Sequence, residues 1–297
     1  MRISKTLALG AGRSLHLLDG GEGPTIVLIH GALTTHVDWL EAPFEAFAAR
    51  GRAIAVDRPG HGLSARPRYQ ASPRAQAAQI REGLAALGAE LPVRLVAHSF
   101  GGIVALAWAA EWPEEVASLL LLSPITRPEF RAIEHSFLGP RAAPLIGPLL
   151  SEAARWTLDR PFLRAVQKLM FSPRNPPPDW LARFPEETVL SPAQMVEEGE
   201  DTATLLPGSP LGLVDWNAIR CPVAVVNGAD DRIVDHRQHA DVLAELIPQA
   251  TATLLEGVGH MPHHQALPEV LAAFDAVNAP ERASREPARS AEPPPPA

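Results

Sequence analysis

The sequence contains a single cysteine, Cys221, among its 297 residues. A chain with one thiol cannot form an internal disulfide, which suits a reducing compartment. Because Cys221 stands at the start of an apolar run, we expect it to be a packed residue of a strand. A surplus of positive charge is missing too, since the formal net charge is −8. This balance argues against nucleic acids and anionic membrane surfaces as partners.

Long hydrophobic segments are also missing. The longest apolar runs, 103–110 and 116–122, are too short to cross a bilayer. Residues 1–10 alternate polar and apolar side chains and lack the apolar centre of a signal peptide. We therefore expect a soluble, cytoplasmic protein without membrane insertion. Because the sequence shows neither a phosphate-binding loop nor the ligand spacing of a metal site, we predict no cofactor and no metal.

Short apolar segments alternate with helical patterns along the chain. After an antiparallel pair at 3–9 and 13–18, the sequence offers runs of the kind that a parallel sheet buries on both faces: 25–30, 53–57, 93–97, 119–123, 223–227 and 252–255. Helical patterns lie between them at 39–50, 74–87, 101–112, 236–247 and 267–277. This alternation predicts an α/β fold with a mostly parallel central sheet and helices on both faces.

The alternation stops between residues 127 and 216. This segment holds thirteen prolines, no clear strand, and short helical patterns at 154–160, 162–171 and 189–198. An irregular loop of that length would be unusual in a compact domain, so we predict an inserted helical lid. The core domain then comprises residues 1–126 and 217–279. Residues 280–297, rich in proline, alanine, glutamate and arginine, are predicted to form a disordered tail.

Ser99 stands where a predicted strand runs directly into a predicted helix, in the segment Ala-His-Ser-Phe-Gly. This is the context that a nucleophile elbow requires. The residues two before and two after the serine must be small so that strand and helix can approach, and here they are Ala97 and Gly101. The usual pattern has glycine at the first position, from which Ala97 differs by one methyl group. We therefore predict that Ser99 is a nucleophile.

A serine hydroxyl needs a general base, and an acid must orient that base. His260 lies in a glycine-rich turn after the last predicted strand, which favours it over the nearby His263 and His264. Asp230 and Asp231 both follow the strand at 223–227. We favour Asp231 as the acid, because its position before a β-branched pair places it at the exposed end of the turn. Both choices follow the chain order of serine, acid and histidine.

An oxyanion hole needs two backbone N–H donors. One is expected from Phe100, the residue after the nucleophile, and the other from Ala32, in the loop after the first parallel strand. His30 and Gly31 shape that loop, since glycine permits a sharp turn. A further loop at 57–64 has the composition of a structured turn, so its Asp57 and His61 are interpreted as structural.

Together these segments resemble the α/β-hydrolase superfamily, in the branch that holds serine esterases, perhydrolases and carbon–carbon bond hydrolases. The resemblance spans residues 25–277, with 127–216 as an uninformative gap. It implies a Ser99–His260–Asp231 triad. Relatives that dehalogenate alkanes or open epoxides carry aspartate at the nucleophile position, so Ser99 argues against both activities.

Acyl transfer is the reaction that these residues support best, and ester hydrolysis is its simplest form. The apolar, aromatic lid favours a small to medium apolar ester as substrate. Candidate pocket residues are His30, Gly31, His98, Trp156 and Phe162. Two alternatives stay open, because fold and triad do not fix the substrate. One is a carbon–carbon bond hydrolase or lyase that uses the same triad, and the other is a non-catalytic binding protein.

Overall fold

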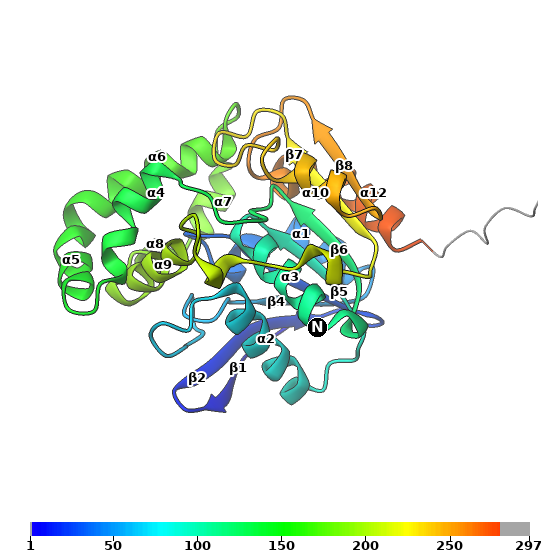
Figure 1. The fold of residues 1–297 in the computed structure, drawn as a ribbon, viewed down its shortest axis with the longest axis horizontal. Helices are drawn as coiled ribbons and strands as arrows, with labels where there is room; N and C mark the ends of the chain where they lie inside the picture. Colours follow the sequence, from blue (N-terminus) through cyan, green and yellow to red (C-terminus); the bar gives the residue numbers. More distant parts are fainter. Residues whose placement is uncertain (1, 280–297) are drawn as a thin grey trace, which may run out of the picture.

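A computed structural model describes residues 2–279, so the tail predicted at 280–297 lies outside the described residues. The centre of the fold is an eight-stranded sheet in the order β1-β2-β4-β3-β5-β6-β7-β8 (Figure 1). Its strands are β1 (Ile3–Gly10), β2 (Arg13–Gly20), β3 (Thr25–Ile29), β4 (Arg52–Val56), β5 (Val93–His98), β6 (Val116–Leu122), β7 (Val223–Gly228) and β8 (Ala250–Leu255). The pairs β1–β2 and β2–β4 are antiparallel, and all later neighbours are parallel. This topology confirms the predicted α/β-hydrolase fold.

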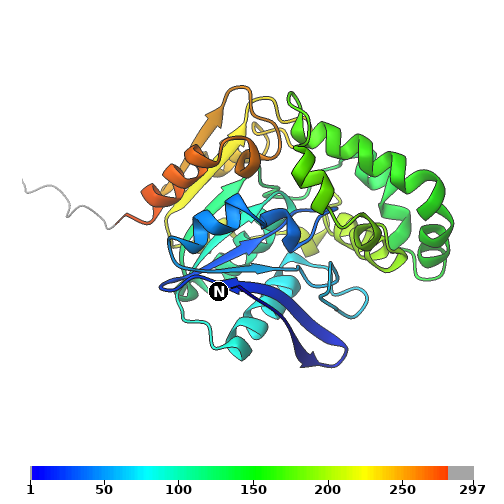
Figure 2. The same ribbon diagram turned by 180° about the vertical axis from the view of Figure 1, so that it is seen from behind.

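Helices cover both faces of the sheet, because side chains alternate between the two faces along each strand. On β3, Val27 and Ile29 face one core while Ile26 and Leu28 face the other. The first core packs against α2 (Pro73–Leu87), α3 (Phe100–Glu111) and α10 (Ala240–Leu246). The second packs against α1 (Ala42–Ala48) and α12 (Leu267–Val277), which lie together in front of the sheet in Figure 2.

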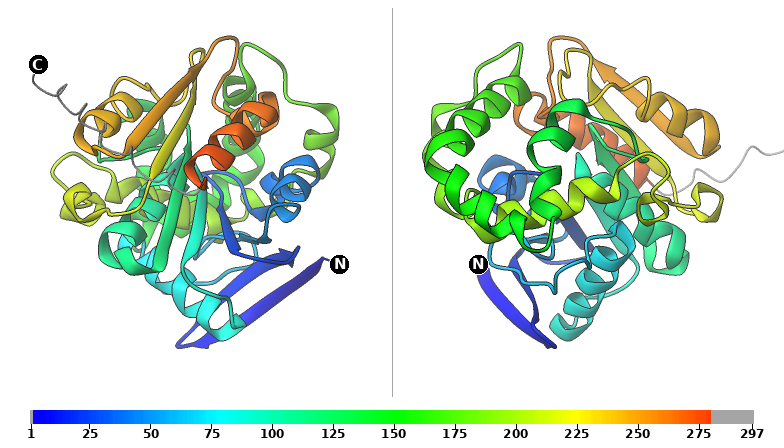
Figure 3. Two further views of the ribbon diagram at one scale, coloured as in Figure 1. Left: turned by 90° about the vertical axis from the view of Figure 1, so that its right-hand side faces the viewer. Right: turned by 60° about the vertical axis from the view of Figure 1, so that its left-hand side comes forward.

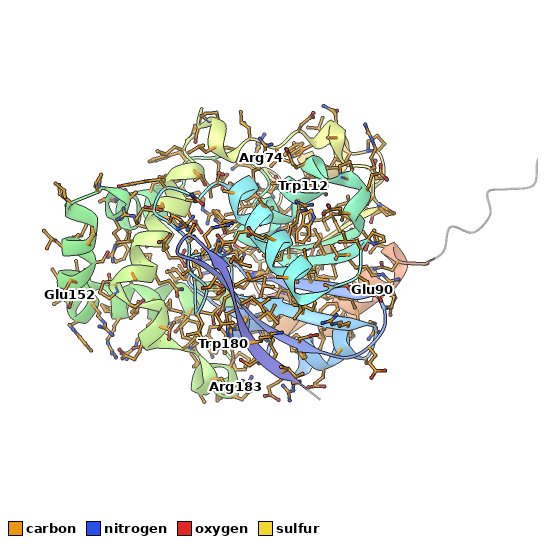
Figure 4. All side chains as sticks on the ribbon, turned by 90° about the horizontal axis from the view of Figure 1, so that it is seen from below. Arg74, Glu90, Trp112, Glu152, Trp180 and Arg183 are labelled. Atoms are coloured by element: carbon orange, nitrogen blue, oxygen red, sulfur yellow. The ribbon has the colours of Figure 1, made fainter. Side chains whose placement is uncertain are left out.

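The segment between β6 and β7 is helical and lies at one end of the sheet, drawn in green at the left of Figure 1. Its helices are α4 (Ala132–Phe137), α5 (Ile146–Ala154), α6 (Arg160–Phe171), α7 (Pro178–Arg183), α8 (Glu186–Val189) and α9 (Pro192–Thr204), with a π-helical turn at Arg155–Asp159. The right-hand view of Figure 3 brings this insertion forward. In Figure 4, Glu152 lies at its outer end and Trp180 lies where it meets the sheet domain. We call this insertion the lid.

Two sequence expectations need correction. The segment 252–255 was expected to be buried on both faces, but β8 is an edge strand whose four central residues are exposed. The predicted helix at 39–50 is divided into a 3₁₀ turn, His36–Trp39, and α1. Pro43, which has no N–H to donate, occupies the first turn of α1, where a proline is tolerated.

Two small loops complete what positions the site. The α11 turn (Pro262–Gln265) follows β8, and the loop at 30–35 follows β3. Both lie at the carboxyl ends of parallel strands, where open α/β sheets place their ligands. Among the described residues, we find no helix with the length and apolar composition needed to cross a membrane.

Candidate active site

Ser99 lies in a sharp turn between β5 and α3. Its backbone has φ 52° and ψ −119°, a conformation that side-chain-bearing residues rarely adopt. This backbone conformation costs about 1–3 kcal/mol of free energy and persists only where surrounding contacts hold it. Here the Ser99 N–H donates to the carbonyl oxygen of Leu122 over 3.0 Å, and the Ser99 carbonyl accepts from the N–H of Ile125 over 3.0 Å. The turn is therefore held by the last residue of the neighbouring strand β6 and by the segment that follows it.

The glycines at positions 31 and 101 are required because there is no space for a larger side chain near the turn. A Cβ on Gly101 would lie 2.6 Å from the carbonyl oxygen of Ile29 and 2.7 Å from that of His30. A Cβ on Gly31 would lie 2.9 Å from the Cβ of Ser99. Real Cβ atoms do not approach other atoms so closely, so the backbone would have to shift. The glycines let the loop after β3 and the start of α3 approach the serine.

His260 and Asp231 form a buried pair. The Nδ1 of His260 lies 2.8 Å from the Oδ2 of Asp231, and the other oxygen of Asp231 accepts from the N–H groups of Ile233 and Val234. Burial alone would raise the pKa of the Asp231 carboxyl. The charge and hydrogen bond of His260, with these two N–H groups, outweigh burial and lower the pKa below its usual value.

This hydrogen bond sets the tautomer of the His260 ring. A carboxylate can only accept, so Nδ1 carries the proton and Nε2 of the neutral ring is free to take one. His260 and Ser99 line the same cavity. The sequence-predicted serine, histidine and acid are thus brought together at one edge of the sheet.

The two residues expected to supply N–H donors to an oxyanion, Ala32 and Phe100, line the same cavity as Ser99 and His260. Phe100 opens α3, where an N–H has no acceptor within the helix. The next residue of the loop, Leu33, has φ 54°, and its N–H donates to the lid residue Glu198.

The cavity is mainly apolar. Lid residues supply much of its wall, including Phe162, Val166 and Leu169 of α6. Phe162 stacks on Phe137 with 3.7 Å between ring centroids. Polar side chains on the wall are Ser99, Arg131, Glu134, His135, Thr202, Arg232 and His260.

Four other candidate pocket residues lie outside this lining. Trp156 is 61% exposed, and the guanidinium groups of Arg155 and Arg160 cover its ring on the outer surface of the lid. His30 and Gly31 begin the loop after β3, and the Nδ1 of His30 donates to the Gly31 carbonyl oxygen over 2.8 Å. His98 is fully buried. For Trp156 the expectation fails because the aromatic side chain points to solvent rather than inward.

His98 belongs to a buried group that sequence reasoning missed. We call Asp38, His98, His263 and His264 the Asp38 cluster. The carboxylate of Asp38 accepts from Nε2 of His263 over 3.1 Å and from Nε2 of His264 over 3.0 Å. The Nε1 of the lid residue Trp180 also donates to it, over 3.1 Å. Asp38 has no sequence signal, because nothing near it marks it as different from a solvent-facing acid.

Three side chains of the Asp38 cluster, Asp38, His263 and His98, have pKa values shifted from their usual range. Burial opposes ionisation, but the charges and hydrogen bonds of His263 and His264 hold the pKa of the Asp38 carboxyl well below its usual range. Burial lowers the pKa of His263 to about 4, although Asp38 acts to raise it. Burial also holds the pKa of His98 well below its usual value, and the charges of His260 and His263 add to this.

Three groups of histidine and carboxylate side chains bring possible metal ligands within 4.8 Å of one another: His16, His36 and Asp57; Asp38, His263 and His264; His61, Glu198 and Asp201. In each group the carboxylates already accept hydrogen bonds from N–H donors. Asp57 pairs with His36, in keeping with the structural role predicted for the loop at 57–64. We assign all three groups to holding loops in place.

Comparison with known proteins adds to this geometry. Residues 26–274 match the model of a family described as the alpha/beta hydrolase family. The chain is 30% identical over 262 residues to a pimeloyl-[acyl-carrier protein] methyl ester esterase of Chromobacterium violaceum, covering 85% of this chain and 94% of that protein.

Solved structures share the fold. A thermophilic esterase from Thermogutta terrifontis has a TM-score of 0.70 and 24% identity, with 93% of this chain and 98% of that chain covered. A 2-hydroxy-6-oxo-6-phenylhexa-2,4-dienoate hydrolase from Rhodococcus sp. strain RHA1 has a TM-score of 0.74 and 20% identity, with the same coverage. At these sequence identities the two structures support the fold assignment alone. The family match covers most of the sheet and all of the lid, and the chain belongs to the alpha/beta hydrolase family.

Proposed function

We propose that this chain is a serine esterase that hydrolyses carboxylic esters through an acyl-enzyme on Ser99. The observation that carries the proposal is the His260–Asp231 hydrogen bond of 2.8 Å at a cavity that Ser99 also lines. The strained backbone of Ser99 supports the same role, because backbone strain of this kind clusters at functional sites.

In the proposed reaction, the Oγ of Ser99 attacks the ester carbonyl carbon and its proton passes to Nε2 of His260. Asp231 stabilises the imidazolium that forms. The N–H groups of Ala32 and Phe100 donate to the oxyanion. His260 then gives the proton to the departing alkoxide, and the C–O bond breaks. A water molecule, activated by the same histidine, attacks the acyl-enzyme and releases the carboxylic acid and Ser99.

The lining of the cavity supports an apolar acyl or alkyl group of small to medium size. Leu138, Val166 and Leu205 lie on its wall with Phe162, and such surfaces favour hydrocarbon chains. The similarity to the esterase from Chromobacterium violaceum, at 30% identity, supports ester chemistry.

A fluorophosphonate probe and a series of p-nitrophenyl esters from acetate to decanoate test the proposal. We expect the probe to label Ser99 and turnover to favour the shorter esters. Ser99→Ala should abolish both signals. Ser123→Ala is the matched control, because Ser123 is also buried, has φ 42° and directly follows the neighbouring strand β6.

Two outcomes would overturn the proposal. One is ester turnover by Ser99→Ala that equals the turnover of the unmodified protein. The other is turnover of a vinylogous diketone, a substrate for carbon–carbon bond hydrolysis, at a kcat/KM well above that of every ester tested.

A further inference from the structure

Glu198 of the lid reaches the loop that carries the proposed oxyanion donor. Its carboxylate Oε1 accepts the backbone N–H of Leu33 over 2.6 Å, although the two residues are 165 positions apart. The Glu198 side chain is 1% exposed, and Oε2 has no hydrogen-bond partner among the described residues. A charge-assisted hydrogen bond of this length is among the stronger contacts that a backbone N–H can make.

The loop needs such a contact because its backbone is strained. Leu33 has φ 54°, which a residue with a side chain adopts only when its surroundings hold it. The Leu33 side chain also packs against the lid, in one hydrophobic cluster with Leu138, Leu163 and Met195. Both the backbone and the side chain of this residue are therefore fixed by the lid.

A second contact fixes the preceding peptide group. The carbonyl oxygen of Gly31 accepts from Nη2 of Arg58 over 3.3 Å and from Nδ1 of His30 over 2.8 Å. The Gly31 carbonyl and the Ala32 N–H belong to the same planar trans peptide group and point in opposite directions. Because Arg58 and His30 hold the carbonyl, they also orient the N–H of Ala32. Arg58 itself is held by Asp201 of the lid, with 2.6 Å between Nη1 and Oδ2.

The two lid carboxylates thus hold the peptide groups on either side of Ala32. From this geometry we infer that Glu198 is a positioning residue, which keeps the Ala32 N–H aimed at the oxyanion by holding the Leu33 N–H. The inference rests on the proposed function, because it needs Ala32 to serve as the oxyanion donor.

The charge of Glu198 is not what the reaction uses. A bare carboxylate near a developing oxyanion would repel it. The fully buried Arg58 forms an ion pair with Asp201 of the lid, and its guanidinium lies 4.5 Å from the ring centroid of Phe100. The useful property of Glu198 is then the acceptor oxygen, which glutamine retains and leucine lacks.

Three variants test this role: Glu198→Gln, Glu198→Leu and Glu200→Leu. Glu200 is the matched control, because it lies on the same helix, is equally buried, and accepts the backbone N–H of Tyr69 over 2.8 Å, far along the chain from the oxyanion loop. Steady-state kinetics on one p-nitrophenyl ester and the Tm of each variant are the measurements.

We expect Glu198→Leu to lower kcat by about 10- to 100-fold with KM changed less than about twofold, the split that marks loss of transition-state stabilisation alone. Glu198→Gln should stay within about threefold of the unmodified protein. Glu200→Leu should lower Tm about as much as Glu198→Leu does and leave kcat within about threefold.

Equal losses of kcat in Glu198→Leu and Glu200→Leu would overturn the positioning role. So would a loss in folded Glu198→Gln as large as in Glu198→Leu. If Glu198→Leu fails to fold, two other measurements test the positioning role. A large loss of kcat in folded Glu198→Gln would contradict it, and so would fast hydrogen exchange of the Leu33 amide in the unmodified protein. Failure of the proposed function is visible separately, because the unmodified protein would then neither hydrolyse esters nor be labelled at Ser99.

Discussion

The imidazole of His98 donates a hydrogen bond from Nε2 to the backbone carbonyl oxygen of His260, with 2.9 Å between the two atoms. The ring is fully buried. Because His98 directly precedes Ser99, this bond joins the turn that carries the proposed nucleophile to the loop that carries the proposed base. The two loops are 162 residues apart in sequence.

Replacing His98 with alanine should affect both stability and turnover. The His260 carbonyl would lose its partner inside the protein and a cavity would form, costing about 2–4 kcal/mol of unfolding free energy. Loosening of the His260 loop should lower kcat by about tenfold. Urea unfolding and ester kinetics check both. His16→Ala, which removes another buried histidine in the β1–β2 hairpin, should lower stability but leave kcat of the folded enzyme near its original value.

Asp231→Asn tests which of two adjacent carboxylates orients His260. Asparagine can present its N–H₂ group to Nδ1 and favour the wrong tautomer, so we expect kcat to fall by about 10³–10⁴-fold. Within residues 2–279 the one hydrogen bond of the Asp230 side chain is from the N–H of Gly257, so Asp230→Asn should change kcat by less than about threefold. A loss in Asp230→Asn that matches the loss in Asp231→Asn would contradict the assignment. Single-turnover kinetics with p-nitrophenyl acetate measure the effect on the acylation step.

The sequence was sufficient to predict that Ser99, Asp231 and His260 lie near one another, because each follows a strand of the parallel part of the sheet. Parallel strands bring their carboxyl ends to one edge, so a local pattern at each end becomes a shared position in space. The same reasoning placed the fold class, which the structure and the family match confirm.

Residues that act through distant partners could not be found this way. Asp38 bonds to Trp180, 142 positions away, and to His263, 225 positions away. Glu198 meets Leu33 across 165 positions. Asp38 lies between two apolar residues, and Glu198 is one of four carboxylates between positions 197 and 201, so neither stands out in the sequence. Only the contact between the lid and the sheet domain gives each its partner. The prediction that Trp156 lines the pocket failed for a similar reason, because aromatic character alone does not show which side of a lid helix faces inward.

Gly101→Ala should destabilise the fold through the elbow. The added Cβ would meet two carbonyl oxygens at 2.6 and 2.7 Å, and overpacking of this kind costs about 1–3 kcal/mol. Gly139→Ala is the matched control, because nothing lies within 4 Å of a Cβ at that position. We expect this control to leave stability unchanged or to raise it by up to about 1 kcal/mol. Equal unfolding midpoints in urea for the two variants would show that the elbow tolerates a methyl group.

Glu197 should make stability depend on pH. Burial is the main cause that raises the pKa of the Glu197 carboxyl to about 7, with Arg66 opposing the rise. The folded state thus holds this proton more tightly than the unfolded state, whose pKa is near 4.5. The stability it contributes is full below pH 4.5 and is lost as pH rises through about 7.

Glu197→Gln removes this titration. The Tm of Glu197→Gln minus the Tm of the unmodified protein should therefore increase between pH 4.5 and pH 7.5. At pH 4.5 the variant keeps a neutral acceptor beside the Nε of Arg66, where the present separation is 2.5 Å. Calorimetry across this range checks the slope, and a Tm difference that stays constant or falls with pH would show that Glu197 is already ionised in the folded protein near pH 5.

Phe162 and Trp156 provide a paired test of where the acyl chain lies. Phe162 lines the cavity and stacks on Phe137, so Phe162→Ala should open space beside Ser99 and move the preferred p-nitrophenyl ester to a longer chain. Each extra buried CH₂ contributes about 0.8 kcal/mol, enough to raise kcat/KM by roughly fourfold per carbon until the new space is filled. Trp156 is 61% exposed on the outer surface of the lid, so Trp156→Ala should leave the chain-length profile of monomeric esters unchanged. The same shift in both variants would mean that the chain runs over the lid surface instead of into the cavity.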